Sequence, residues 1–192
     1  QRYRRRYVDL VANPEVAEVF RKRSRIVRAL RNRLDEKGFV EVETPMLQAI
    51  PGGAAANPFQ TRYEALSRDM YLRIAPELYL KRMLVGGFDK VFELNRNFRN
   101  EGLDRSHNPE FTMLEIYQAY GDVRSMMDLV QDLVVHAAEK VCGTLRVGTE
   151  ERPVDLTTPW RKVEYADLIR EAAGGDWFDL DLPAAVARAK EL

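Results

Sequence analysis

The sequence predicts an α+β fold, on three observations. Two long segments, one beginning at Pro14 and one after Asp122, repeat apolar residues with the 3.6-residue period of an amphipathic helix. Shorter runs between them, such as 70–74 and 90–95, are predicted to be strands. The runs 98–101 and 111–117 are predicted to be two antiparallel strands, because residues 102–110 between them carry the glycine, asparagine and proline that are typical of a loop.

The first helix is predicted to run from Pro14 to just before Gly38. Asn13 is a favourable N-cap residue, and proline suits the first helical position. Gly38 stands where a left-handed residue commonly ends a helix. The apolar stripe comprises Val16, Phe20, Val27, Leu30 and Leu34. The opposite face carries Arg21, Arg25, Arg28 and Asn32, which is typical of a solvent-exposed surface.

The next elements are shorter. Phe39 and Val40 begin a strand that ends before Pro45. Residues 51–56, Pro-Gly-Gly-Ala-Ala-Ala, form a loop that is either a plain turn or a backbone that a ligand can approach closely. Residues 75–85 form a helix, with a proline in its first turn and a glycine past its end.

The C-terminal part begins with a helix that Asp122 caps and Gly143 ends. Residues 144–156 are expected to form a hairpin, and 162–172 a short helix. The run 183–192 consists of strong helix formers without a stop signal. Together with the missing initiator methionine, this run indicates a fragment of a longer protein, in which 160–192 is expected to start a helical insertion.

Composition restricts the class of protein. Lys plus Arg and Asp plus Glu each total 30, and hydrophobic residues make up 45%, so the chain is globular and does not bind nucleic acid through bulk charge. No run of 18 apolar residues exists, so no membrane association is expected. The single cysteine, Cys142, excludes an intrachain disulfide and fits a reducing compartment. The basic N-terminal segment 1–12 is either a solvated arm or a contact with RNA phosphates.

Strand alternation identifies the candidate site. It places Arg99 and Glu101 on one face of the first strand, and Phe111, Met113, Glu115 and Tyr117 on one face of the second. A buried core would not accommodate an arginine and two glutamates without partners. A fully solvent-exposed face would not be expected to carry phenylalanine and methionine. A half-buried polar pocket satisfies both constraints. The alternative is a structural ion-pair network under a loop.

These residues lie in stretches that resemble the bacterial-type class II lysyl-tRNA synthetases. Residues 37–47, which include Gly-Phe-Val-Glu-Val-Glu-Thr-Pro, match the first signature motif of class II synthetases. Residues 98–117, with Phe-Arg-Asn-Glu and His-Asn-Pro-Glu-Phe, match the second. The stretches 2–10, 51–56 and 75–82 narrow the resemblance to the lysine enzyme. The resemblance runs to about residue 143 and implies that 1–192 is a partial catalytic domain, an antiparallel sheet flanked by helices.

The resemblance also implies an activity. Such enzymes activate L-lysine with ATP to lysyl-adenylate and transfer the lysyl group to the 3′ end of tRNA(Lys), in the cytoplasm. By the motif match, Arg99 is the catalytic residue and contacts both the α-phosphate and the lysine carboxylate. The residues expected at ATP are Arg99, Glu101, His107, Asn108 and Phe111. Those expected at lysine are Gly53, Glu77, Arg99, Glu115 and Tyr117. Those expected at the tRNA acceptor end are Asp104, Arg105 and Ser106.

The family further implies a homodimer that packs through the first motif around Pro45. The chain departs from the family pattern because it has no anticodon-binding barrel and no third motif. The Mg²⁺ ligands belong to that absent part, so no metal ligands are expected in these residues. The isolated segment is expected to bind ATP weakly and to activate lysine slowly. Two alternatives remain: a synthetase-like paralogue that lysylates a protein, and a non-catalytic module that binds an amino acid or ATP.

Overall fold

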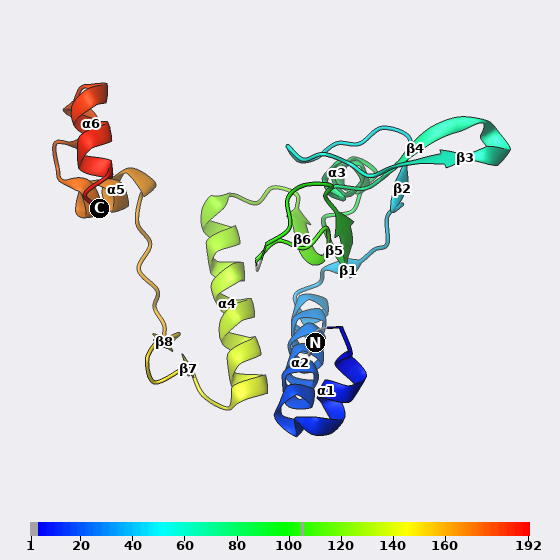
Figure 1. The fold of residues 1–192 in the computed structure, drawn as a ribbon, viewed down its shortest axis with the longest axis horizontal. Coiled ribbons are helices and arrows are strands. Elements are labelled where there is room, and N and C mark those ends of the chain that lie inside the picture. Colours follow the sequence, from blue (N-terminus) through cyan, green and yellow to red (C-terminus); the bar gives the residue numbers. More distant parts are fainter. Residues whose placement is uncertain (1–3, 105) are drawn as a thin grey trace. The chain divides into compact units, whose positions relative to one another are not determined.

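The computed structural model of the chain describes residues 4–104 and 106–192. The chain divides into two compact units, residues 1–154 and 155–192, and each is described by itself (Figure 1). Two sequence predictions fall partly outside the described residues: Arg105 of the expected tRNA contact, and residues 1–3 of the basic N-terminal segment. Most of the remainder of that segment forms helix α1 (Arg6–Ala12).

A three-stranded sheet carries the candidate site in the first unit. Its strands are β1 (Val40–Glu41), β5 (Lys90–Phe98) and β6 (Glu110–Gln118), in the order β1-β5-β6. Strands β5 and β6 are antiparallel along their whole length, from the pair Lys90 and Gln118 to the pair Phe98 and Glu110. Strand β1 joins the other edge of β5 in parallel. The α+β class is therefore confirmed, and residues 111–117 do lie in an antiparallel strand, but their partner is 90–98 and not the predicted 98–101.

The predicted boundary between strands 90–95 and 98–101 is wrong. Residues 90–98 form one strand, and Arg99 to Glu101 lie beyond its end. The apolar pattern breaks at Asn95, but the pairing continues, because the ladder with β6 joins backbone groups whatever the side chains are. The Arg99 N–H still donates to the Pro109 carbonyl at 2.9 Å, so the two neighbouring segments separate only after Arg99.

Two long helices pack on one face of this sheet. Phe92 of β5 lies in a buried cluster with Leu34 of α2 (Pro14–Glu36), with Phe39, and with Leu129 and Leu133 of α4 (Val123–Cys142). Because side chains alternate along a strand, Val91, Glu93, Asn95 and Asn97 lie on the other face. Helix α3 (Glu77–Val85) also contacts β5 and β6.

The helix ends largely match their predicted signals. Asp122 accepts a hydrogen bond from the Ser125 N–H in a full capping box, and Gly143 ends α4 with φ at 69°. Pro14 begins α2, and Gly38 follows it with φ at 78°. The predicted cap at Asn13 is wrong, because its side-chain amide donates to Asp9 of α1 at 2.8 Å. Phe20 of the predicted apolar stripe is 47% exposed.

A second three-stranded sheet, all antiparallel, has the order β2-β4-β3. Its strands are β2 (Leu47–Gln48), β3 (Gln60–Tyr63) and β4 (Arg68–Leu72), and the 3₁₀ turn Glu64–Leu66 joins the last two. The strand predicted at 70–74 is thus shifted by two residues. The expected hairpin is present as β7 (Arg146–Gly148) and β8 (Pro153–Asp155).

The second unit is helical, as predicted. It contains α5 (Tyr165–Ala173), a 3₁₀ turn at Trp177–Asp179 and α6 (Leu182–Ala189). Helix α6 ends at Ala189, so the prediction of a helix through Leu192 is wrong. Of the helices in the described parts of the chain, none has both the length and the apolarity needed to cross a membrane.

Candidate active site

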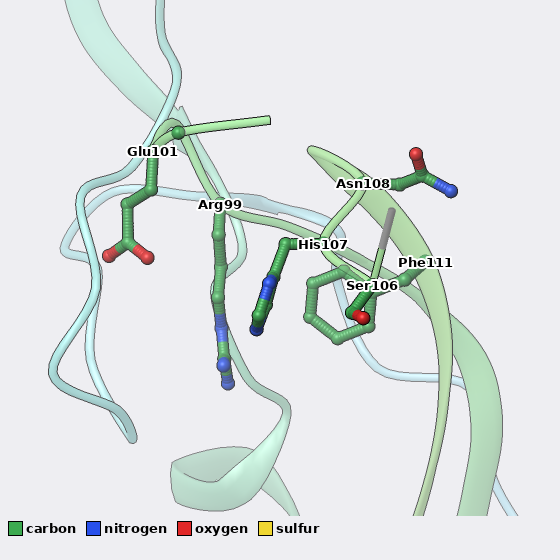
Figure 2. A pocket seen from close by; sticks show the side chains of 7 residues that line it. Arg99, Glu101, Ser106, His107, Asn108 and Phe111 are labelled. Carbon is green, nitrogen blue, oxygen red and sulfur yellow. The ribbon is translucent and has the colours of Figure 1, made fainter. Parts of the chain in front are cut away.

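A cavity of about 430 Å³ opens where β5 and β6 separate. Its lining comprises Arg99, Glu101, Gly102, Ser106, His107, Asn108 and Phe111. All five residues predicted to bind ATP are among them. Figure 2 shows the side chains of Arg99 and His107 extending in the same direction, near the ring of Phe111, while Asn108 points away from them.

Arg99 combines an aromatic neighbour with a buried, unpaired donor. Its guanidinium carbon lies 5.2 Å from the centre of the Phe111 ring, and the pairing of Asn97 with Phe111 explains why these two neighbours meet. Within the described part of the chain, the Arg99 Nε is buried without a hydrogen-bond partner. A buried donor without a partner is costly. Because β5 ends at Phe98, Arg99 stands on the loop margin and not within the predicted strand.

The loop between the strands is held by Asp104. One carboxylate oxygen, Oδ1, accepts the backbone N–H groups of Ser106 at 2.6 Å and His107 at 2.8 Å. The other, Oδ2, lies 2.7 Å from Nδ1 of His107. The hydrogen bond from the Ser106 N–H, followed by those from His107, holds the pKa of Asp104 below its ordinary value.

Glu101 ties the cavity to the loop of small residues. The Asn57 N–H donates to Glu101 Oε1 at 3.3 Å, and the Asn100 N–H donates to the Asn57 carbonyl at 2.8 Å. Residues 51–56 contain no helix or strand, as predicted. One end of this loop therefore lies against the cavity margin.

The other part of the loop packs against helix α3. Gly53 has φ at 88°, and a Cβ there would lie 2.9 Å from Cβ of Glu77 and 3.2 Å from Cβ of Ala75. Any side chain would collide with the helix, so glycine is required for the backbone to reach Glu77. Glu77 itself is in contact with Lys81 one turn along α3. The structure thus brings together Gly53 and Glu77, two of the predicted lysine ligands.

Glu115 and Tyr117 form a pair on β6. The Tyr117 hydroxyl donates to Glu115 Oε2 at 3.1 Å, and both residues are half-buried. Burial raises the pKa of Glu115, and the nearby carboxylate of Glu77 raises it further. Burial and the charge of Glu115 also raise the pKa of Tyr117. Glu77 therefore lies close enough to act electrostatically on this pair.

The two groups of predicted residues share a sheet face but not the cavity. Phe111, Glu115 and Tyr117 alternate onto one face of β6, and the register places Glu93 opposite Glu115. The cavity lining includes Arg99 but not Gly53, Glu77, Glu115 or Tyr117. The candidate site therefore consists of a cavity and, further along the sheet, a group of half-buried carboxylates.

A buried ionic network under this face was missed by the sequence analysis. Arg73 and Glu93 are each 1% exposed, and their Nη1 and Oε1 atoms lie 2.6 Å apart. The Thr44 hydroxyl donates to Glu93 Oε2 at 2.6 Å, and Arg73 Nε donates to the Arg96 carbonyl. A structural ion-pair network thus exists beside the candidate site and uses different residues. A glutamate inside an apolar strand was the available signal.

The described residues do not assemble a metal site. No group of three or more histidine, cysteine, aspartate or glutamate side chains in residues 4–104 and 106–192 is arranged to hold a metal ion. Three carboxylates, those of Glu77, Glu93 and Glu115, are close enough for the first two to act electrostatically on the third, but Lys81 pairs with Glu77 and Arg73 pairs with Glu93.

Comparison with known proteins identifies similar chains. The family model described as tRNA synthetases class II (D, K and N) matches residues 1–190. The chain is 58% identical to the lysine–tRNA ligase of Carboxydothermus hydrogenoformans over all 192 residues. It is 61% identical to that of Syntrophomonas wolfei and 54% identical to that of Clostridium botulinum, each over 92% of the chain. The chain spans 39%, 36% and 35% of the lengths of these three relatives.

Proposed function

Because this chain belongs to the class II tRNA synthetases of the D, K and N type, we propose that its protein activates L-lysine with ATP and charges tRNA(Lys). In this proposal, residues 1–154 supply part of the active site. One observation carries the proposal: a cavity lined by Arg99, His107 and Phe111 lies on the same sheet face as the half-buried carboxylate of Glu115. The relatives named lysine–tRNA ligase support the choice of lysine.

The cavity is the proposed nucleotide site. Phe111 offers an aromatic face for adenine, while Glu101 and Asn108 offer polar groups that can select among bases. Arg99 and His107 supply the groups that face phosphate. An arginine suits this position because its guanidinium is always charged and can bridge two planar sets of oxygens.

The carboxylates further along the face are the proposed lysine site. Glu115, supported by the Tyr117 hydroxyl, would receive the ε-ammonium of lysine. Glu77 and the backbone of Gly53 would receive the α-ammonium. An uncharged side chain would leave the Glu115 carboxylate buried without its cation, and this cost favours lysine over apolar amino acids.

The chemistry follows from this placement. An oxygen of the lysine carboxylate attacks the α-phosphorus of ATP, the bond to the β-phosphate oxygen breaks, and pyrophosphate leaves. Arg99 would contact both the attacking carboxylate and the α-phosphate, which aligns them and offsets the charge that builds up at phosphorus. A hydroxyl at the 3′ end of the tRNA then attacks the lysyl carbonyl, and AMP leaves.

Further partners belong to the same proposal. Asp104 and Ser106 lie on the loop that would meet the tRNA acceptor end, and Arg105 lies outside the described residues. Mg²⁺ would accompany ATP, and the described residues assemble no cluster of side chains to hold it. We propose a homodimer through the segment around Pro45, and action in the cytoplasm, where tRNA is charged.

Isothermal titration of the chain with lysine and with norleucine tests the lysine site. Norleucine has an apolar side chain without the ε-ammonium, so we expect it to bind at least about tenfold more weakly, and Glu115→Gln to remove most of this preference. Equal binding of the two amino acids would contradict the proposal.

Pyrophosphate exchange and aminoacylation by the protein that contains these residues test the reaction. Lysine-dependent exchange and charging of tRNA(Lys) are expected, and Arg99→Ala is expected to slow exchange by about 10²–10³-fold. Lysylation of a protein in place of tRNA would favour the paralogue, and ligand binding without exchange would favour a regulatory module.

A further inference from the structure

The carboxylate of Asp104 gives its two oxygens different partners. Oδ1 accepts two backbone N–H groups, from Ser106 and His107, and these bonds close the turn. Oδ2 faces Nδ1 of His107 at 2.7 Å. The two backbone hydrogen bonds to Oδ1 therefore prevent the carboxylate from rotating, and they fix the position of the Oδ2 atom that faces His107.

This contact determines which nitrogen of His107 carries the proton. An ionised carboxylate can only accept, so the imidazole must donate from Nδ1. The low pKa of Asp104 keeps the carboxylate ionised. The second ring nitrogen, Nε2, is then the one that remains for a ligand, and His107 is part of the cavity lining together with Arg99 and Glu101.

We infer that Asp104 is a positioning residue, which orients His107 and holds one proton on Nδ1, so that Nε2 is the nitrogen that takes up a second proton and donates to the phosphates of a nucleotide in the cavity. The inference rests on the proposed function for the nature of the ligand, but not for the state of the histidine. When His107 takes up a second proton, that proton must go to Nε2. The ring then donates to an anion beside Arg99, with the opposing charges of Asp104 and Glu101 nearby.

Asp104→Asn separates the two functions of the carboxylate. The two backbone N–H groups require an oxygen at the Oδ1 position, so the new amide must place its NH₂ group toward His107. An NH₂ group donates, and Nδ1 must then accept. The turn is retained, but the proton of the neutral imidazole moves to Nε2, and the second proton is disfavoured.

Nitrogen-15 NMR of the ligand-free chain measures the tautomer directly. The chain has only two histidines, and a His136→Gln variant assigns their signals. We expect neutral His107 to be protonated on Nδ1 in the natural sequence and on Nε2 in Asp104→Asn. The matched control is Asp122→Asn, which alters another aspartate that caps a backbone N–H. The inference is wrong if His107 shows the same tautomer with and without the Asp104 carboxylate.

Titration with ATP and with adenosine tests the consequence for binding. At pH 6, Asp104→Asn is expected to weaken ATP binding about three- to fivefold, as for one exposed charge pair, and to leave adenosine binding unchanged. Unchanged ATP affinity, or an equal loss for adenosine, would overturn the inference. If the natural chain binds neither compound, the cavity is not a nucleotide site in this chain by itself, and the NMR result alone decides the role of Asp104.

Discussion

Single side chains determine the charge of the candidate site. Arg99 offers a buried Nε without a partner in the described part of the chain, and Glu115 offers a half-buried carboxylate. Both groups are unfavourable in the empty protein. An unpaired donor and a desolvated carboxylate are more typical of a binding site than of a structural ion pair.

The pH dependence of lysine binding should reflect the protonation of Glu115. Burial raises its pKa, so the carboxylate gains its proton at a higher pH than an ordinary glutamate. The protonated form cannot pair with the ε-ammonium, so the affinity for lysine should fall as the pH falls through this raised pKa. Glu115→Gln should weaken binding about 10- to 100-fold at pH 7.5 and flatten the profile between pH 4.5 and 8.

Calorimetric titrations at several pH values measure both effects. The control is Glu110→Gln, which removes a carboxylate from the exposed end of the same strand and should leave the profile unchanged. The raised pKa also means that the protonated carboxyl is more favoured in the folded chain than in the unfolded chain. Glu115→Gln should therefore not destabilise the ligand-free protein, and a large loss of stability would assign Glu115 a structural role.

At the scale of elements, helices α2 and α4 are joined by an ion pair as well as by their apolar faces. Arg33 of α2 makes two hydrogen bonds to Asp132 of α4, at 2.5 Å and 2.8 Å, and Lys37 lies 3.1 Å from the same carboxylate. The hydrogen bonds from Arg33, aided by Lys37, lower the pKa of Asp132 to about 2.

This pair should make stability depend on pH. The folded pKa of Asp132 lies below the unfolded value of about 3.9, so its contribution is complete above pH 4 and is lost as the pH falls toward 2. Asp132→Asn should cost about 1 kcal/mol at pH 7, because the pair is partly exposed, and less near pH 3. Urea unfolding at both pH values measures the difference. Asp35→Asn removes a similar charge from α2 and should cost less, and an equal cost would contradict the assignment.

At the scale of the first unit, the buried pair of Arg73 and Glu93 joins three segments. Glu93 belongs to β5, Arg73 follows β4, and both bond to Thr44 next to Pro45. Arg73→Met would leave Glu93 charged and buried, and this should cost about 3–5 kcal/mol in urea unfolding. Adding Glu93→Gln should recover part of the loss. If the free-energy cost of the double variant equals the sum of the costs of the two single variants, the two side chains are not energetically coupled.

The proposed homodimer makes a separate prediction for the whole molecule. The first motif and the residues just after it expose apolar side chains, among them Val40 at 45%, Leu47 at 41% and Ile50 at 80%. Ile50→Asp should therefore shift the chain from dimer to monomer in analytical ultracentrifugation, because a charge would be buried at the interface. Val85→Asp is the control, since Val85 is 90% exposed on α3 outside this segment. A dimer that survives Ile50→Asp would place the interface elsewhere.

The sequence alone determined the features that depend on neighbouring residues. The helix ends at Asp122 and Gly143 and the alternation of Phe111, Glu115 and Tyr117 follow from local geometry. The family motifs identified the residues that the structure gathers around one cavity. Their roles toward ATP, lysine and tRNA remain predictions.

Only the tertiary structure decided which distant groups meet. It joined 90–98 into one strand, because pairing with β6 outweighs the polar side chains at its end. It paired Arg73 with Glu93, and it separated the cavity from the carboxylates along the sheet. These contacts depend on how segments far apart in the chain pack together, and the order of residues along one segment carries no direct signal of that packing.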